Sequence, residues 1–243
     1  MSQFGDAIRE LSTAQKSAKG VSLYSRYVNR PVGRVLAAAG YSVKLTPNQV
    51  TLISAAVTFA GVVMTATLRP SSAAALGIFA ALFLGFALDS ADGQLARLTG
   101  AGSAAGEWLD HVVDCAKMLA LHMAVLVCFH RHFGFSDPVL LCVPIAFQFA
   151  AVMVFFGGIL TEQLKRAERL RSGAGRPASP APASTLRSVA LLPVDYGVFC
   201  ALFLLFGSQD LFVAGYCVLL AAHVLFMAGF LVKWYRELSA PGR

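Results

Sequence analysis

Four aspartates lie at the junction of two long apolar runs: Asp89, Asp92, Asp110 and Asp114. An ionised carboxylate at bilayer depth costs roughly 2.5–3.5 kcal/mol on insertion scales. Four neighbouring carboxylates also repel one another. Such a cluster persists when a cation neutralises it, and a bound metal ion is the first candidate.

The spacing of these aspartates predicts that they meet. Asp89 and Asp92 are three residues apart, and Asp110 and Asp114 are four apart, so each pair lies on one helical face. Two facing helices would present four carboxylates to one pocket, which suits Mg²⁺ or Mn²⁺. Two such ions about 3.5–4 Å apart can bridge phosphate oxygens. The alternative, a helix cap or half of an ion pair, explains one intramembrane aspartate better than four.

The residues between the two pairs suit a phosphate ligand. Gly93 and Ala96 lack bulk, so a ligand can approach the backbone, and Arg97 offers a cationic fork. Helix packing would explain the small residues alone, and membrane anchoring would explain the arginine alone. Together with the carboxylates they predict a metal-dependent pyrophosphate site that catalyses phosphoryl transfer.

The composition indicates a polytopic membrane protein. Of 243 residues, 57% are hydrophobic and 14% charged, and the mean hydropathy is +0.65. The net charge of +7 resides in loops beside apolar runs, which favours anionic lipid headgroups over nucleic acid as partners. The five cysteines lie within apolar runs without a C-x-x-C pair, and we interpret them as small hydrophobes.

We predict an all-α fold with six transmembrane helices, because each apolar run approaches the length needed to cross a bilayer. Thr46 and Pro47 indicate the start of the first helix. In the fifth, Asp195 follows Pro193 and is expected to satisfy backbone groups that the proline leaves unpaired. The expected spans are 50–68, 72–88, 107–129, 138–160, 188–207 and 211–232.

Lysine and arginine are concentrated on one side of this arrangement. They are frequent before the first span, in the 161–187 loop and in the C-terminal tail, whereas the opposite loops hold only Arg69 and Arg131. The positive-inside rule then places both termini and the aspartates on the cytoplasmic side. We expect a multi-pass protein of a prokaryotic plasma membrane.

The chain divides into a core domain and flanking segments. We expect a flexible cytoplasmic tail over 1–21, a juxtamembrane amphipathic helix over 22–45 and the six-helix domain over 46–235. Residues 236–243 are a second cytoplasmic tail. The segment 172–186 is rich in Gly, Pro, Ala and Ser, which predicts a flexible cytoplasmic loop inside the core domain.

The pattern D-x-x-D-G-x-x-A-R-x₈-G-x-x-x-D-x-x-x-D resembles the signature of the CDP-alcohol phosphotransferase family. All its fixed positions are filled: Asp89, Asp92, Gly93, Ala96, Arg97, Gly106, Asp110 and Asp114. With the six-span layout, the resemblance extends over about residues 22–235. It implies a membrane enzyme, often a homodimer, that uses a CDP-linked donor, releases CMP and binds two Mg²⁺ or Mn²⁺ ions per site.

The resemblance also implies roles for individual residues. The metal ligands would be Asp89, Asp92, Asp110 and Asp114, and Asp114 would also be the general base. Gly93 and Ala96 would contact the cytidine nucleotide, Arg97 its phosphates, and Asn48 the region of the cytosine pocket. Glu107 lies on the Asp110 face, and we expect it to support or cap the site rather than bind metal. Basic residues are candidates for binding an acceptor phosphate or for membrane anchoring: Lys165, Arg166, Arg169 and Arg187.

The motif leaves the two substrates open. The segments 25–34 and 45–51 are similar to members that handle inositol phosphates, so our first choice is transfer from CDP-diacylglycerol to inositol phosphate, followed by glycerol phosphate. The alternative is transfer from a CDP-activated small alcohol or polyol to a lipid or polyol. An intramembrane prenyltransferase, a cation transporter and an inactive homologue are remoter alternatives, disfavoured by the complete, closely spaced motif.

Overall fold

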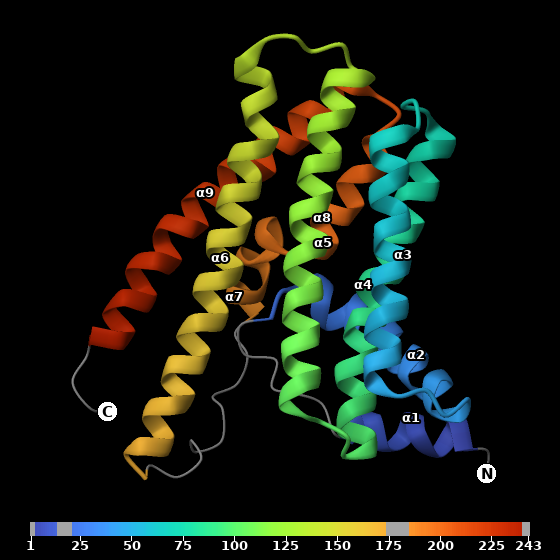
Figure 1. Cartoon of the computed structure of the whole chain (residues 1–243), viewed down its shortest axis with the longest axis vertical. Helices are drawn as coiled ribbons and strands as arrows, with labels where there is room; N and C mark the ends of the chain where they lie inside the picture. Colours follow the sequence, from blue (N-terminus) through green and yellow to red (C-terminus); the bar gives the residue numbers. More distant parts are fainter. Residues whose placement is uncertain (1–2, 14–20, 174–184, 240–243) are drawn as a thin grey trace.

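The computed structural model describes residues 3–13, 21–173 and 185–239, and these residues form helices and short connections without a β-strand (Figure 1). The all-α prediction is therefore confirmed for this part of the chain. Its long apolar helices could cross a membrane by length and composition: α3 (Pro47–Thr67), α4 (Ser72–Thr99), α5 (Ala104–Arg131), α6 (Pro138–Arg171) and α9 (Gln209–Ser239).

The fifth expected span, 188–207, is not one continuous helix. It is divided into α7 (Thr185–Ala190), the turn η2 (Leu192–Val194), α8 (Tyr196–Leu202) and η3 (Phe203–Leu205). Pro193 has no backbone N–H to continue a helix. The Asp195 carboxylate accepts a hydrogen bond from the Gly197 backbone N at 2.7 Å and so begins α8. Five long spans, rather than the predicted six, are present in the described residues.

The broken segment leads directly into α9. In Figure 1, α7 lies near the middle of the bundle's long axis, and the chain reaches the upper end before α9 descends. Helix α1 and the end of α9 thus lie toward the same end of the bundle as the α4–α5 connection. The described residues therefore contain five helices of membrane-spanning length and one shorter, broken apolar segment.

The N-terminal region is more structured than a flexible tail. Residues Gln3–Thr13 form α1, in which Ala7 and Leu11 are 2% and 1% exposed, respectively. These two side chains are four residues apart and pack into an apolar cluster with Ala37 and Leu95. Residues 1–2, 14–20 and 240–243 of the expected tails, and 174–184 of the expected loop, lie outside the described residues.

The juxtamembrane segment contains η1 (Ser25–Asn29) and α2 (Arg30–Ser42). Helix α2 buries Ala37 and Ala38 in the same cluster and packs beside α4. Gln94 of α4 donates a hydrogen bond to the Arg30 backbone O at 3.1 Å. One side of the expected amphipathic helix therefore faces the protein.

Local capping fixes the helix ends near the aspartates. Thr46 and Gln49 form a capping box at the start of α3, so the predicted start is confirmed. Helix α4 ends at Gly100, whose φ of 65° lies in the left-handed region. The Ser103 hydroxyl accepts a hydrogen bond from the Gly106 backbone N at 3.0 Å and begins α5.

Two kinds of packing hold the bundle together. Helices α3 and α4 approach closely at Gly85, where a Cβ atom would lie 2.1 Å from Thr58 Oγ1. The opposite side is filled by aromatic rings that α5, α6, α8, η3 and α9 contribute. The fully buried rings are Phe129, Phe147, Phe203, Phe206, Phe212 and Tyr216. Helices α4 and α5 both pack against α3, and α5 also packs against α6, so that the aspartates of α4 and α5 lie near one another.

Candidate functional site

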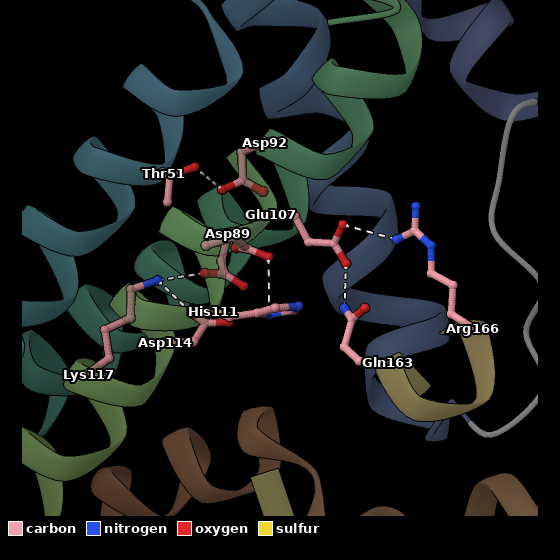
Figure 2. A network of polar contacts seen from close by, with 10 residues as sticks. Thr51, Asp89, Asp92, Glu107, His111, Asp114, Lys117, Gln163 and Arg166 are labelled. Atoms are coloured by element: carbon pink, nitrogen blue, oxygen red, sulfur yellow. Dashed lines mark hydrogen bonds and ion pairs between the residues drawn. The ribbon is translucent and has the colours of Figure 1, made fainter. Parts of the chain in front are cut away.

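The four predicted aspartates lie on α4 and α5, and Figure 2 shows Asp89, Asp92 and Asp114 near one another. Asp89, Asp92 and Asp110 each place one carboxylate oxygen within 4.8 Å of the others' oxygens. A set of three carboxylate oxygens at this separation fits a hard divalent cation. Asp114 lies beside Asp89 but outside this set of three. The structure thus brings together side chains that the sequence distributes over a stretch of 26 residues.

A neutral donor on α3 holds the Asp92 carboxylate. The Thr51 hydroxyl on α3 donates a hydrogen bond to Asp92 Oδ2 at 2.5 Å, and Asp92 is only 5% exposed. Thr51 was not among the predicted site residues. The sequence feature that could have identified it is its position one turn after Pro47, at the end of the Thr-Pro-Asn-Gln-Val-Thr segment.

Lys117 is the most consequential residue that the sequence reasoning missed. Its Nζ lies 2.5 Å from Asp89 Oδ1, 3.1 Å from Asp114 Oδ1 and 3.0 Å from Ser54 Oγ. Figure 2 shows contacts from this ammonium to both the Asp89 and the Asp114 carboxylates. Its position in the sequence could have identified it as a partner of the aspartates. It lies one turn after Asp114 inside an apolar run, and a lysine within a membrane needs an anionic partner.

A cavity of about 920 Å³ opens beside Asp92 and Asp110. Its lining includes all the residues that were expected to contact the nucleotide: Asn48, Gly93, Ala96 and Arg97. At Gly93, an added Cβ would have one near neighbour, Arg97 Nη1 at 3.5 Å, so the cavity reaches the helix backbone there. Gly106 lies close to Asn48, whose Oδ1 would be 3.1 Å from an added Cβ.

Arg30 adds positive charge near this cavity. Its guanidinium is close enough to Arg97 for the two charges to interact. Burial, and then the neighbouring Arg26, lower the pKa of Arg30. An arginine side chain nevertheless remains protonated near neutral pH. The two guanidinium groups therefore make this region one that an anionic ligand would suit.

A second cavity, of about 260 Å³, adjoins the other two aspartates. It is lined by Asp89, Asp114 and Lys117 and is otherwise largely aromatic and aliphatic. His122 and His223 also line it; His122 Nδ1 lies 2.6 Å from Tyr216 Oη, and His223 Nδ1 donates to the Leu219 backbone O. The aspartates thus separate a polar cavity from an apolar one.

Glu107 links two helices and lies outside the set of three carboxylates. It accepts hydrogen bonds from Gln163 Nε2 at 2.9 Å and Arg166 Nη1 at 3.3 Å, both on α6 (Figure 2). Ser103, rather than Glu107, caps α5. These contacts agree with a supporting role beside the larger cavity, which Glu107 lines.

The four basic residues considered for an acceptor phosphate do not converge on one point. Lys165 pairs with Glu237 of α9, and Arg166 pairs with Glu107. Arg169 and Arg187 are exposed, on α6 and α7 respectively. Of these four, only Arg166 lines the larger cavity.

Residues 44–228 match the family model described as CDP-alcohol phosphatidyltransferase. The chain therefore belongs to this family, and the resemblance that the motif indicated is confirmed. It is a phosphotransferase enzyme of the divalent-metal-dependent type, and Asp89, Asp92 and Asp110 are suited to hold such an ion. No curated protein matches the chain.

Two similar solved structures come from Mycobacterium tuberculosis. One is phosphatidylinositol phosphate synthase in complex with manganese and citrate, at 18% identity, covering 88% of this chain and 91% of that one, with a TM-score of 0.57. The other is the same enzyme with CDP-DAG bound, at 19% identity, covering 88% and 96%, with a TM-score of 0.57. At these identities the similarity shows the fold.

Proposed function

We propose that the chain transfers a phosphatidyl group from CDP-diacylglycerol to an alcohol and releases CMP. The observation that carries this proposal is the convergence of Asp89, Asp92 and Asp110 beside the cavity that Gly93 and Arg97 line. Acidic ligands adjoin a cationic, sterically open nucleotide cavity, as a metal-bound diphosphate requires. The CDP-DAG complex of the solved relative supports this choice of donor.

Asp114 is proposed as the general base. Its carboxylate takes the proton of the acceptor hydroxyl, and the resulting oxygen forms a bond to the distal phosphorus of the donor. The bond from that phosphorus to the CMP oxygen breaks, and CMP leaves as an anion toward Arg97. A divalent ion held by the aspartates would supply charge stabilisation for the phosphate oxygens. The nucleotide would lie along Asn48, Gly93 and Ala96, which line the larger cavity.

Inositol phosphate remains our first choice of acceptor, followed by glycerol phosphate. The similarity of segments 25–34 and 45–51 to inositol-phosphate enzymes and the solved relatives support it. Arg166 lines the larger cavity, which supports it as the first choice for binding an acceptor phosphate, ahead of Lys165, Arg169 and Arg187.

One observation favours a second candidate. The smaller cavity adjoins Asp114 and is lined mainly by apolar and aromatic residues, including Phe147 and Phe199. Such walls suit a lipid alcohol better than a phosphorylated polyol, because burying a phosphate there would leave it without donors. The donor would then be a CDP-activated small alcohol or polyol.

A donor-by-acceptor screen in nanodiscs separates these candidates. CMP release is measured with CDP-diacylglycerol or CDP-polyols as donors, against phosphorylated polyols or diacylglycerol as acceptors. CMP release that requires both CDP-diacylglycerol and a phosphorylated polyol supports the first candidate, whereas release only from CDP-polyols with a lipid supports the second. The Asp110→Asn variant provides the background rate, and absence of CMP release with every pair refutes both.

We also propose that the aspartates and both termini face the cytoplasm in a prokaryotic plasma membrane, that α2 lies at the membrane surface and that the enzyme is a homodimer. The lysine and arginine distribution supports this orientation. Single cysteines introduced at Asp137 and at Lys233, in a background without the native cysteines, should react with an impermeant reagent from opposite sides. Light scattering in detergent tests the dimer.

A further inference from the structure

Lys117 lies inside the membrane-spanning helix α5 and is 5% exposed. An ammonium group has three N–H donors. Here the three contacts within hydrogen-bond distance are Asp89 Oδ1, Asp114 Oδ1 and Ser54 Oγ. The group is therefore fully satisfied where it lies, and withdrawing it would leave buried charges unpaired.

The Ser54 contact makes this arrangement more than a chance ion pair. Ser54 is itself fully buried, and its hydroxyl donates to the Gly85 backbone O at 2.8 Å. The α3–α4 contact thus orients the Ser54 oxygen as an acceptor for Lys117. Three helices, α3, α4 and α5, contribute to one site for a positive charge.

The two sides of the aspartate cluster differ as a result. Asp89, Asp92 and Asp110 each offer one oxygen within 4.8 Å of the others, and the Lys117 ammonium contacts Asp89 and Asp114. Between Asp89 and Asp114, the ammonium already engages the facing oxygens. A second divalent ion bridging these two carboxylates would compete with the ammonium for their negative charge and would be repelled by Nζ.

We propose that Lys117 is a built-in cation that replaces the second metal ion, so that each protomer binds one divalent ion at Asp89, Asp92 and Asp110. The inference rests on the proposed function only in taking these aspartates as metal ligands. It revises the two-ion expectation that the motif alone suggested. Lys117 acts on Asp114 and Asp89 and is a positioning residue, since nothing requires it to touch the substrate.

Manganese binding to the purified protein tests this directly. Metal-free enzyme in detergent is titrated with Mn²⁺ alone, and electron paramagnetic resonance measures free ion and any coupling between bound ions. Wild type should saturate at one Mn²⁺ per protomer without Mn–Mn coupling. Lys117→Met should bind a second ion and show the coupling, whereas Lys117→Arg should retain one. Lys233→Met, on α9, is the matched lysine control and should behave like wild type.

Two bound ions in wild type, or none, overturn the proposal, as does a folded Lys117→Met protein that still binds only one. If Lys117→Met fails to fold, the wild-type stoichiometry and Lys117→Arg still decide, because two ions in either contradict it. A parallel CMP-release assay separates the two proposals. Turnover with two bound ions refutes only this inference, whereas one bound ion without CMP release from any donor refutes only the proposed function.

Discussion

Two places in this bundle hold carboxylates among apolar helices, and they are satisfied in opposite ways. Asp195 accepts hydrogen bonds from the Ser22 hydroxyl, from Ser25 Oγ at 2.6 Å and from the Gly197 backbone N. All its donors are neutral and come from the chain. The aspartate cluster instead has four carboxylates near one ammonium, with Thr51 as a neutral donor.

The contrast separates a structural carboxylate from a functional cluster. Asp195 joins η1 to the break before α8, and its neutral donors leave it no need for an external cation. The cluster retains an excess of negative charge after Lys117 is counted, so it requires a cation from outside. Burial alone does not distinguish the two places, whereas the number and charge of the protein's own donors does.

The largest expected effect follows from removing the external cation. EDTA should abolish CMP release, and Mg²⁺ or Mn²⁺ should restore it, because the excess charge at the cluster would otherwise repel the donor diphosphate. Asp110→Asn should lose turnover and manganese binding together. Asp137→Asn, at the start of α6, is the control and should retain both; turnover that survives the chelator would contradict the metal assignment.

Next in size is the loss of the proposed base. Asp114→Asn should lower turnover by roughly 10²–10⁴-fold, the usual contribution of a general base. Nucleotide binding should be largely retained, because Asp114 does not line the larger cavity. Isothermal titration with CMP and a CMP-release assay measure the two quantities, and near-normal turnover would remove Asp114 from this role.

Asp195→Ala should act on stability. Losing a buried carboxylate that accepts several hydrogen bonds should destabilise the protein by about 1–3 kcal/mol, because the Ser22 and Ser25 hydroxyls and the Gly197 N–H lose their partner. The thermal unfolding midpoint in detergent should fall, while manganese stoichiometry stays at the wild-type value. Asp210→Ala is the matched control. Altered metal stoichiometry in folded Asp195→Ala protein would contradict the structural assignment.

The smallest effect is expected at Glu107. Its partners Gln163 and Arg166 are exposed, and such pairs contribute about 0–1 kcal/mol. Glu107→Gln should therefore change turnover by less than about fivefold, and manganese stoichiometry should remain at the wild-type value. A loss of bound manganese would instead make Glu107 a ligand and enlarge the functional cluster.

Hydrophobic runs and helix-capping residues in the sequence predicted most of the helices of this fold. The hydrophobic runs located the five long helices, and Thr46 with Pro47 located the start of α3. The break at Pro193 was visible in the sequence, but its consequence was underestimated because the flanking residues are apolar enough to resemble a span. The packing of α1 was missed because Ala7 and Leu11 form too short an apolar stripe to be significant without its partner surface.

The sequence by itself determined that four carboxylates, two small residues and an arginine would share one region, because helical periodicity and a short connection leave little freedom. Only the tertiary structure decided which charges meet. Lys117 could have faced any neighbour of α5, but the close contact of α3 with α4 places Ser54 and Asp89 around its ammonium. The electrostatic balance of the site depends on distances of a few ångströms between different helices, which spacing along one chain does not specify.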